Sequence, residues 1–168
     1  MNHVVCHGIP SDRVLRDGDA VNIDVTAIVD GYYGDTSRMF CIGNTSVKLN
    51  NLIDVTHQSM IRAIKILKPG IRLGDIGYEI QTFVEENGFS VVKDFCGHGI
   101  STTFHEPPNI LHYGKKNTGM DLRPGMTFTI EPMINAGKYD TKMLNDGWTA
   151  VTKDKSLSAQ FEHTLGIT

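Results

Sequence analysis

Polar and apolar residues alternate along residues 21–29, as they do in a β-strand that buries one of its two faces. Ile23 and Val25 fall on one face of this predicted strand, and Asn22 and Asp24 fall on the other. We therefore expect a half-buried strand whose polar face carries an acidic residue in its middle.

Asp30 and Gly31 follow this strand and form a dipeptide that strongly favours a two-residue hairpin turn. Counting back from such a turn pairs Thr26 with Asp35, so Asp24, Thr26 and Asp35 share one face. Asp24 and Asp35 are then diagonal neighbours, roughly 7–8 Å apart at the backbone. Converging carboxylates repel each other, and one normally holds a proton unless a cation lies between them. The hairpin alone fits either solvated carboxylates or a cation site.

The rest of the chain predicts two helices followed mainly by strands. Apolar residues at helical spacing end at Pro69-Gly70, and a second helix is expected over about 74–87. Residues 96–125 are rich in Gly, Pro and His, and a long irregular stretch of this kind is more often functional than not. Strands are predicted at residues 89–95, 126–134 and 159–168, with a hairpin at 143–153. This order predicts a single α+β domain over residues 1–168, with helices on one face of a mostly antiparallel sheet.

Composition narrows the possible partners. The net charge is -3 over 168 residues, without a long Lys/Arg run, so nucleic acid is not expected as the main ligand. No apolar run has the length of a membrane span, and no secretory signal is recognisable. Cys6, Cys41 and Cys96 are too scattered for a disulfide framework or a zinc knuckle. A reducing, cytoplasmic setting fits best.

Two more carboxylates occupy strand positions. Glu131 shares a face with Thr129, and Glu162 shares one with Thr164, as Asp24 does with a threonine. Each carboxylate taken singly is more often a solvated group. Together with His98, whose flanking glycines allow close backbone approach, they supply four carboxylates and one imidazole. Such an oxygen-rich set suits Mn, Fe, Co or Zn in a two-metal centre better than a structural zinc site.

Five stretches of the chain resemble the bacterial type I methionine aminopeptidases, in the same order and with matching spacing. They are VVCHGIP, NIDVTAIVDGYYGDTSRMF, GHGISTTFHEPP, MTFTIEPM and DGWTAVTKDKSLSAQFEHT. The resemblance covers essentially the whole chain. It implies the pita-bread fold, a pseudo-twofold α+β architecture with a curved, mostly antiparallel sheet and helices on its outer face. It also implies a dinuclear metal enzyme that removes the initiator methionine when the second residue is small.

The resemblance places the five metal ligands of the family at Asp24, Asp35, His98, Glu131 and Glu162. It implies that Asp35 and Glu162 bridge two divalent ions. Asp24 is then expected to chelate one ion, and His98 and Glu131 to bind the other. Glu131 is also the expected proton shuttle between the attacking water and the leaving amine.

The family's auxiliary residues match further positions. His105 is expected to stabilise the developing oxyanion, and His7 to orient the backbone just past the scissile bond. A purely structural role stays open for both histidines. Phe104 and Trp148 match residues around the methionine side-chain pocket. A site that can hold one monovalent cation through backbone oxygens matches Asn2, Val4 and Ser158.

The chain departs from the family pattern at two places. Relatives normally begin several tens of residues earlier, so we expect the usual N-terminal segment and part of the methionine-pocket wall to be missing. Ser101-Thr102-Thr103 stands where relatives often have a glycine and a basic residue after GHGI.

The expected partner is the N-terminus of a nascent polypeptide, with the ribosome as a candidate meeting place. We expect a monomer that does not associate with membranes.

Two other functions stay open at the level of the sequence. A pita-bread peptidase that cuts before proline uses the same ligands. A non-catalytic binding module could keep the fold, although such a module is expected to lose ligands and all five are present here.

Overall fold

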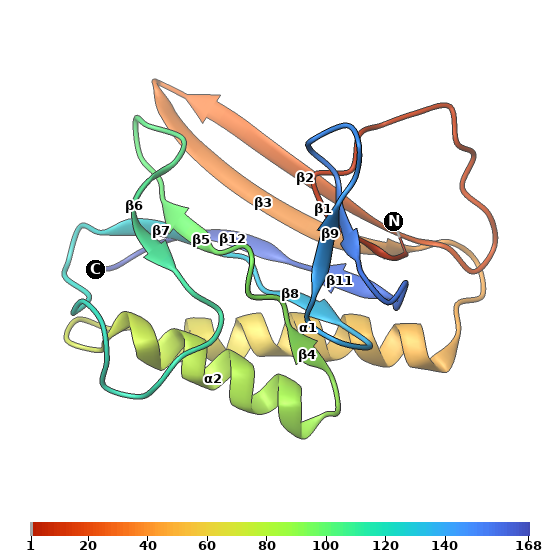
Figure 1. Cartoon of the computed structure of the whole chain (residues 1–168). Coiled ribbons are helices and arrows are strands. Elements are labelled where there is room, and N and C mark those ends of the chain that lie inside the picture. Colours follow the sequence, from red (N-terminus) through yellow and green to blue (C-terminus); the bar gives the residue numbers. More distant parts are fainter. Residues whose placement is uncertain (1) are drawn as a thin grey trace.

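The structure is a computed structural model that describes residues 2–168 and contains two helices and twelve short strands (Figure 1). The helices are α1 (Val47–Lys65) and α2 (Leu73–Glu86). The strands are β1 (Val4–Cys6), β2 (Ala20–Val29), β3 (Tyr32–Cys41), β4 (Ser90–Val91), β5 (Gly97–Gly99), β6 (Glu106–Ile110), β7 (Thr127–Ile130), β8 (Met133–Asn135), β9 (Thr141–Met143), β10 (Ala150–Thr152), β11 (Ser158–Gln160) and β12 (Glu162–Gly166). Within residues 2–168, every helix is too short or too polar to cross a membrane.

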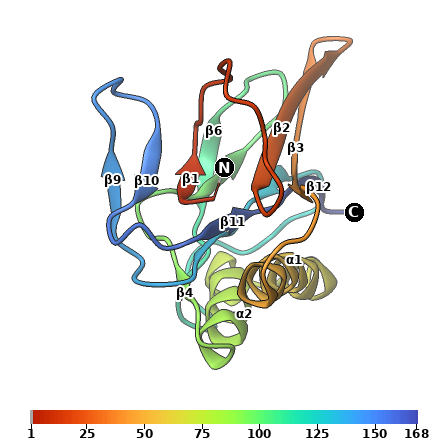
Figure 2. The same cartoon turned by 90° about the vertical axis from the view of Figure 1, so that its right-hand side faces the viewer.

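The strands form three antiparallel sheets. The six-stranded sheet has the order β2-β3-β12-β7-β5-β6, and two three-stranded sheets have the orders β11-β8-β4 and β1-β10-β9. Both helices lie on one side of these sheets, whereas the β2–β3 and β9–β10 hairpins rise on the other side (Figure 2). This arrangement confirms the expected α+β class with helices on one face.

The β2–β3 hairpin has the register that its sequence predicts. Val29 pairs with Tyr32, and Thr26 pairs with Asp35. Asp30 and Gly31 both have positive φ values, 50° and 83°, as a type I′ turn requires. The acidic residues of both strands are therefore on one face, as expected.

The opposite, apolar face of this hairpin differs from the expectation. Ile23 is 50% exposed and Val25 is 53% exposed, so the prediction of a half-buried strand is wrong for this part of β2. Both residues line a groove of about 700 Å³ that extends to Ile53 of α1 and to Phe161. Within residues 2–168, α1 packs against β11 and β8 and α2 packs against β4 and β6, which leaves the apolar face of the hairpin open to this groove.

The core lies between the two helices and the central strands. Leu52 and Met60 of α1 and Ile76 and Ile80 of α2 are completely buried, together with Ile134 of β8. Ser46 caps α1, because its hydroxyl accepts a hydrogen bond from the Leu49 N–H. This packing holds the sheets from the side opposite to the carboxylates.

Two of the expected strands are interrupted. The strand expected over 126–134 is divided into β7 and β8 at Glu131-Pro132, and the strand expected over 159–168 is divided into β11 and β12 at Phe161. At both interruptions the chain passes from the three-stranded to the six-stranded sheet or back. Glu131 and Glu162 therefore lie where two neighbouring chain segments change sheets. The strand expected over 89–95 is reduced to β4, and the irregular stretch 96–125 contains β5 and β6.

Candidate metal centre

Side chains from widely separated strands meet on the polar face of the β2–β3 hairpin. Asp35, His98 and Glu162 each offer a ligand atom that lies within 4.8 Å of the other two. Glu131 joins this group, with its Oε1 3.7 Å from the His98 Nε2. Asp24 is close enough to hydrogen-bond Glu162 and to be affected by the Asp35 charge. The structure thus brings together all five residues that the sequence singled out as ligands.

Hydrogen bonds fix the orientation of Asp35. The Thr26 hydroxyl donates to Asp35 Oδ1 at 2.9 Å, across the hairpin register described above. The Asp35 backbone N–H donates to the Thr164 hydroxyl at 2.8 Å. Asp35 is thereby held within the hairpin while it still offers a carboxylate oxygen to the group that it forms with His98 and Glu162.

The ring of His98 is also fixed. Its Nδ1 lies 3.0 Å from the Gly99 carbonyl oxygen. Because a carbonyl can only accept, Nδ1 carries a proton, and Nε2 is the ring nitrogen that faces the Glu131 carboxylate. A backbone acceptor of this kind is what orients metal-binding histidines in general.

Close backbone contacts hold β5 in place on both sides of His98. A Cβ added to Gly97 would collide with the Thr129 carbonyl oxygen, and one added to Gly99 would collide with the Pro107 carbonyl oxygen. The expectation that the flanking glycines permit close approach is therefore confirmed.

Glu131 is held by three hydrogen bonds. The Thr129 hydroxyl donates to its Oε1 at 2.8 Å and accepts the His98 backbone N–H at 3.1 Å. Gln160 Nε2 donates to Oε2 at 3.4 Å, and the Glu131 backbone N–H donates to His112 Nε2 at 3.1 Å. The sequence pattern had indicated Thr129 as a hydroxyl residue on the same face. It gave no role to Gln160 or His112, because their contacts depend on long-range packing.

The carboxylates raise one another's pKa values. Burial raises the pKa of Glu162 to about 10, and the charges of Glu131 and Asp35 add to this effect. Burial raises the pKa of Glu131 to about 8, with further contributions from Asp24 and Asp35. Asp24 is the most exposed of the group, and partial burial together with the Asp35 charge raises its pKa to about 6. Without a cation, the four carboxylates therefore cannot all be ionised at neutral pH.

The cluster fits divalent metal ions. Among residues 2–168, its carboxylates form no ion pair with a lysine or arginine, and the buried Glu162 Oε1 has no hydrogen-bond partner. Four carboxylates and one imidazole suit first-row divalent ions. The nearby Cys6 is a poor ligand, because burial first and then Glu131 and Asp24 raise the pKa of its thiol to about 12.

Aromatic and imidazole rings adjoin the cluster on the β5–β6 side. The His105 ring lies 4.2 Å from the His98 ring and 3.9 Å from the Phe104 ring, between centroids. Phe104 stacks on Tyr33 at 5.4 Å. Burial and the neighbouring His98 lower the pKa of His105, which is largely exposed. Near neutral pH this ring can therefore donate one N–H without carrying a charge.

A second ring group contains His7. Its ring lies 4.8 Å from the Trp148 ring and 5.8 Å from the Phe95 ring. Its φ of 57° is in the left-handed region, which costs free energy for a non-glycine residue. Trp148 remains 57% exposed. Both sequence-predicted aromatic residues thus lie next to histidines, one in each group.

The residues matched to a monovalent-cation site come from neighbouring segments, since β1 contacts β11. The Ser158 backbone N–H donates to the Asn2 carbonyl oxygen at 2.8 Å. Val4 pairs with Val151 of β10 in a different sheet. The cation itself stays a prediction.

Comparisons with known proteins agree on one family. The model of metallopeptidase family M24 matches residues 1–168. The methionine aminopeptidase of Rickettsia prowazekii (strain Madrid E) is 58% identical over 169 residues, which is 100% of this chain and 65% of that protein. The crystal structure of methionine aminopeptidase from Rickettsia prowazekii matches with a TM-score of 0.98 at 58% identity, over 99% of this chain and 68% of that one.

A more distant match is the prolidase from Pyrococcus furiosus, with a TM-score of 0.76 at 26% identity, over 96% of this chain and 42% of that one. These matches confirm the expected pita-bread fold. The chain spans about 65% of the length of the first relative that it matches.

Proposed function

The chain belongs to metallopeptidase family M24, and on that premise we propose that it is an aminopeptidase that removes N-terminal methionine. Its proposed substrates are peptides and nascent proteins whose second residue is small. The observation that carries the proposal is the convergence of four carboxylates and one imidazole on one face of the sheet. The 58% identity to a methionine aminopeptidase, against 26% to a prolidase, favours methionine over a residue preceding proline.

Family membership implies a divalent metal cofactor, and we propose two ions, drawn from Co, Mn, Fe and Zn. The proposed ligands are Asp24, Asp35, His98, Glu131 and Glu162. When bound, such ions lower the pKa of a coordinated water and polarise the carbonyl of the scissile peptide bond.

Glu131 is the proposed proton carrier. Its carboxylate belongs to the proposed ligand set, so it lies beside the water that the ions would activate and can exchange a proton with it. Oε1 already accepts the Thr129 hydroxyl, whereas Oε2 has only the long contact with Gln160. We therefore assign the transferred proton to Oε2, which receives it from the attacking water and passes it to the leaving amine.

The two exposed histidines are proposed to contact the substrate. His105 is neutral near pH 7 because its pKa is lowered, so its N–H can donate to the oxygen that develops negative charge. Burial also lowers the pKa of His7, and its ring is proposed to orient the backbone after the scissile bond. Phe104 and Trp148, each next to one of these histidines, are proposed to contact the methionine side chain.

The test is peptide cleavage by the purified 168-residue chain. Metal is removed with a chelator, Co, Mn, Fe or Zn is added back, and methionine release from a Met-Ala-Ser peptide is measured. We expect release that depends on added metal and that falls about 10²–10⁴-fold in Glu131→Gln, the range for loss of a general base. Glu86→Gln, at the exposed last position of α2, is the matched control and should keep full activity.

Two results would contradict the proposal. Methionine release that persists without metal would exclude the metal mechanism. Faster cleavage of an Xaa-Pro peptide than of Met-Ala-Ser would assign the chain to the proline-specific activity instead.

A further inference from the structure

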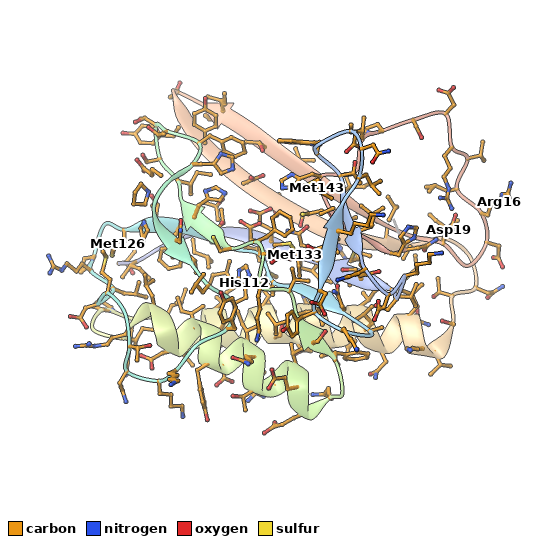
Figure 3. The ribbon with its side chains drawn as sticks, in the orientation of Figure 1. Arg16, Asp19, His112, Met126, Met133 and Met143 are labelled. Atoms are coloured by element: carbon orange, nitrogen blue, oxygen red, sulfur yellow. The ribbon has the colours of Figure 1, made fainter. Side chains whose placement is uncertain are left out.

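His112 is a completely buried histidine that lies outside the predicted ligand set. Its exposed fraction is 0%, and it follows β6, which brings it between the sheet and the helical layer (Figure 3). A buried imidazole needs partners for both ring nitrogens. The contacts of these two nitrogens indicate what His112 does.

One ring nitrogen of His112 contacts the backbone of Glu131. The Glu131 N–H donates to His112 Nε2 at 3.1 Å, so Nε2 must be unprotonated. Nδ1 therefore carries the proton, yet it has no hydrogen-bond partner among residues 2–168. Burial lowers the pKa of His112 to about 3, which keeps the ring neutral near pH 7. The fold thus tolerates an unsatisfied buried donor in order to keep this acceptor.

The backbone at Glu131 needs such an acceptor. Strand pairing of β7 ends at Ile130, which pairs with His163, and Pro132 follows without an N–H of its own. Glu131 therefore lies beyond the ladder, at the point where the chain changes sheets. At this point the His112 side chain provides the hydrogen-bond acceptor that a neighbouring strand would provide within a sheet.

We propose that His112 is a positioning residue, whose Nε2 holds the Glu131 backbone so that the Glu131 carboxylate is directed into the metal centre. The kinetic consequence rests on the proposed function, whereas the structural and metal-binding consequences do not. His112 acts through Glu131 and touches neither substrate nor metal in this proposal.

Two substitutions separate the acceptor from the bulk of the ring. His112→Gln keeps an oxygen near the position of Nε2, and His112→Leu fills similar space without an acceptor. We expect His112→Leu to lower kcat, and the affinity for divalent metal, by about 10–100-fold, the usual range for residues that orient a ligand. KM should stay within about twofold, because substrate contacts are unchanged. His112→Gln should recover most of both losses.

Three measurements are made on each purified full chain. Mn²⁺ binding is titrated calorimetrically, Met-Ala-Ser cleavage gives kcat and KM, and ¹⁵N NMR reports hydrogen exchange at the Glu131 amide. In His112→Leu the Glu131 amide should exchange faster, and in His112→Gln it should stay protected. Leu49→Ala, a buried site in the first turn of α1, is the control for a general loss of stability.

The proposal is wrong if His112→Leu keeps Mn²⁺ affinity and Glu131 amide protection. It is equally wrong if Leu49→Ala produces the same loss of metal affinity at a matched fall in Tm, or if His112→Gln recovers nothing. Should the unaltered chain release no methionine, the proposed function fails, but the Mn²⁺ titration and the amide exchange still decide the role of His112.

Discussion

At the scale of single residues, the candidate metal centre depends on two glycines and a threonine that allow the ligand side chains to approach one another. Gly97 and Gly99 allow β5 to approach the backbones of Thr129 and Pro107, and this approach brings the His98 ring to the carboxylates. The Thr129 hydroxyl then links the His98 backbone to Glu131. The ligand geometry is thus fixed by residues that bind no metal themselves.

Gly97→Ala is predicted to weaken metal binding. The new Cβ would collide with the Thr129 carbonyl oxygen, so β5 must move and His98 moves with it. A displaced ligand should lower metal affinity about 10–100-fold. Isothermal titration with Mn²⁺ measures the change.

Gly34→Ala is the matched control for this prediction, because a Cβ at Gly34 meets no atom within 4 Å. We expect its metal affinity and stability to equal those of the unaltered chain. If the two alanine variants bind Mn²⁺ equally well, close approach at Gly97 does not position His98.

At the scale of elements, the breaks between strands position the ligand residues as much as the strands themselves do. β7 and β8 are separated at Glu131-Pro132, and β11 and β12 are separated at Phe161. Glu131 and the first residue of β12, Glu162, thereby face the cluster from adjacent segments. The β2–β3 hairpin supplies the two aspartates from the other side, through an uninterrupted register.

The hairpin turn offers a prediction that separates stability from metal binding. Gly31 has a φ of 83°, and a left-handed conformation costs a non-glycine residue about 1–2 kcal/mol. Gly31→Ala should therefore lower the free energy of unfolding by about that amount, measured by urea denaturation. Mn²⁺ affinity should be retained, because the turn lies at the end of the hairpin remote from the pairing of Asp24 and Ser37. An unchanged urea midpoint would show that the turn tolerates alanine.

At the scale of the whole molecule, metal binding and folding are coupled. The carboxylates come from three strands and from the junction between β7 and β8, so an unfolded chain does not hold them together. Free metal at about 100 times its Kd should stabilise the folded chain by about 2.7 kcal/mol, which corresponds to a Tm increase of roughly 5–10 °C. Thermal unfolding with and without Mn²⁺ checks this value. A Tm that does not respond to Mn²⁺ would mean that the cluster does not bind it.

The metal-free chain should lose stability as the pH rises. Folding raises the pKa of Glu131 to about 8 and that of Glu162 to about 10, from 4.5 in the unfolded state. A group whose pKa is raised by folding contributes fully below its unfolded pKa, and this contribution is lost as the pH rises through the folded values. In chelator, Tm should therefore fall as the pH rises from about 4.5 to about 10.

Glu162→Gln is the control for this pH dependence, because glutamine does not titrate. Its Tm should depend less on pH over the same range in chelator. A metal-free chain whose Tm rises with pH would contradict the assignment of these two groups as mutually repelling carboxylates.

The sequence by itself determined the α+β class, both helices, the hairpin register and the five residues of the candidate centre. These features follow from local patterns: alternation sets the face of Asp24 and Asp35, the Asp30-Gly31 turn sets their pairing, and helical spacing sets α1 and α2. Carboxylates on polar strand faces could likewise be recognised from their positions alone, as could the motifs that resemble a family.

Only the tertiary structure decided how these parts meet. The interruption at Glu131, the contact of His112 with its backbone and the exposure of Ile23 and Val25 depend on segments far apart in the chain. Local periodicity carries no information about which distant surface covers a strand face or which side chain completes an interrupted ladder. Those outcomes are set by the packing of α1 against β8 and β11 and of α2 against β4 and β6, because that packing fixes where the sheets separate and where the carboxylates converge.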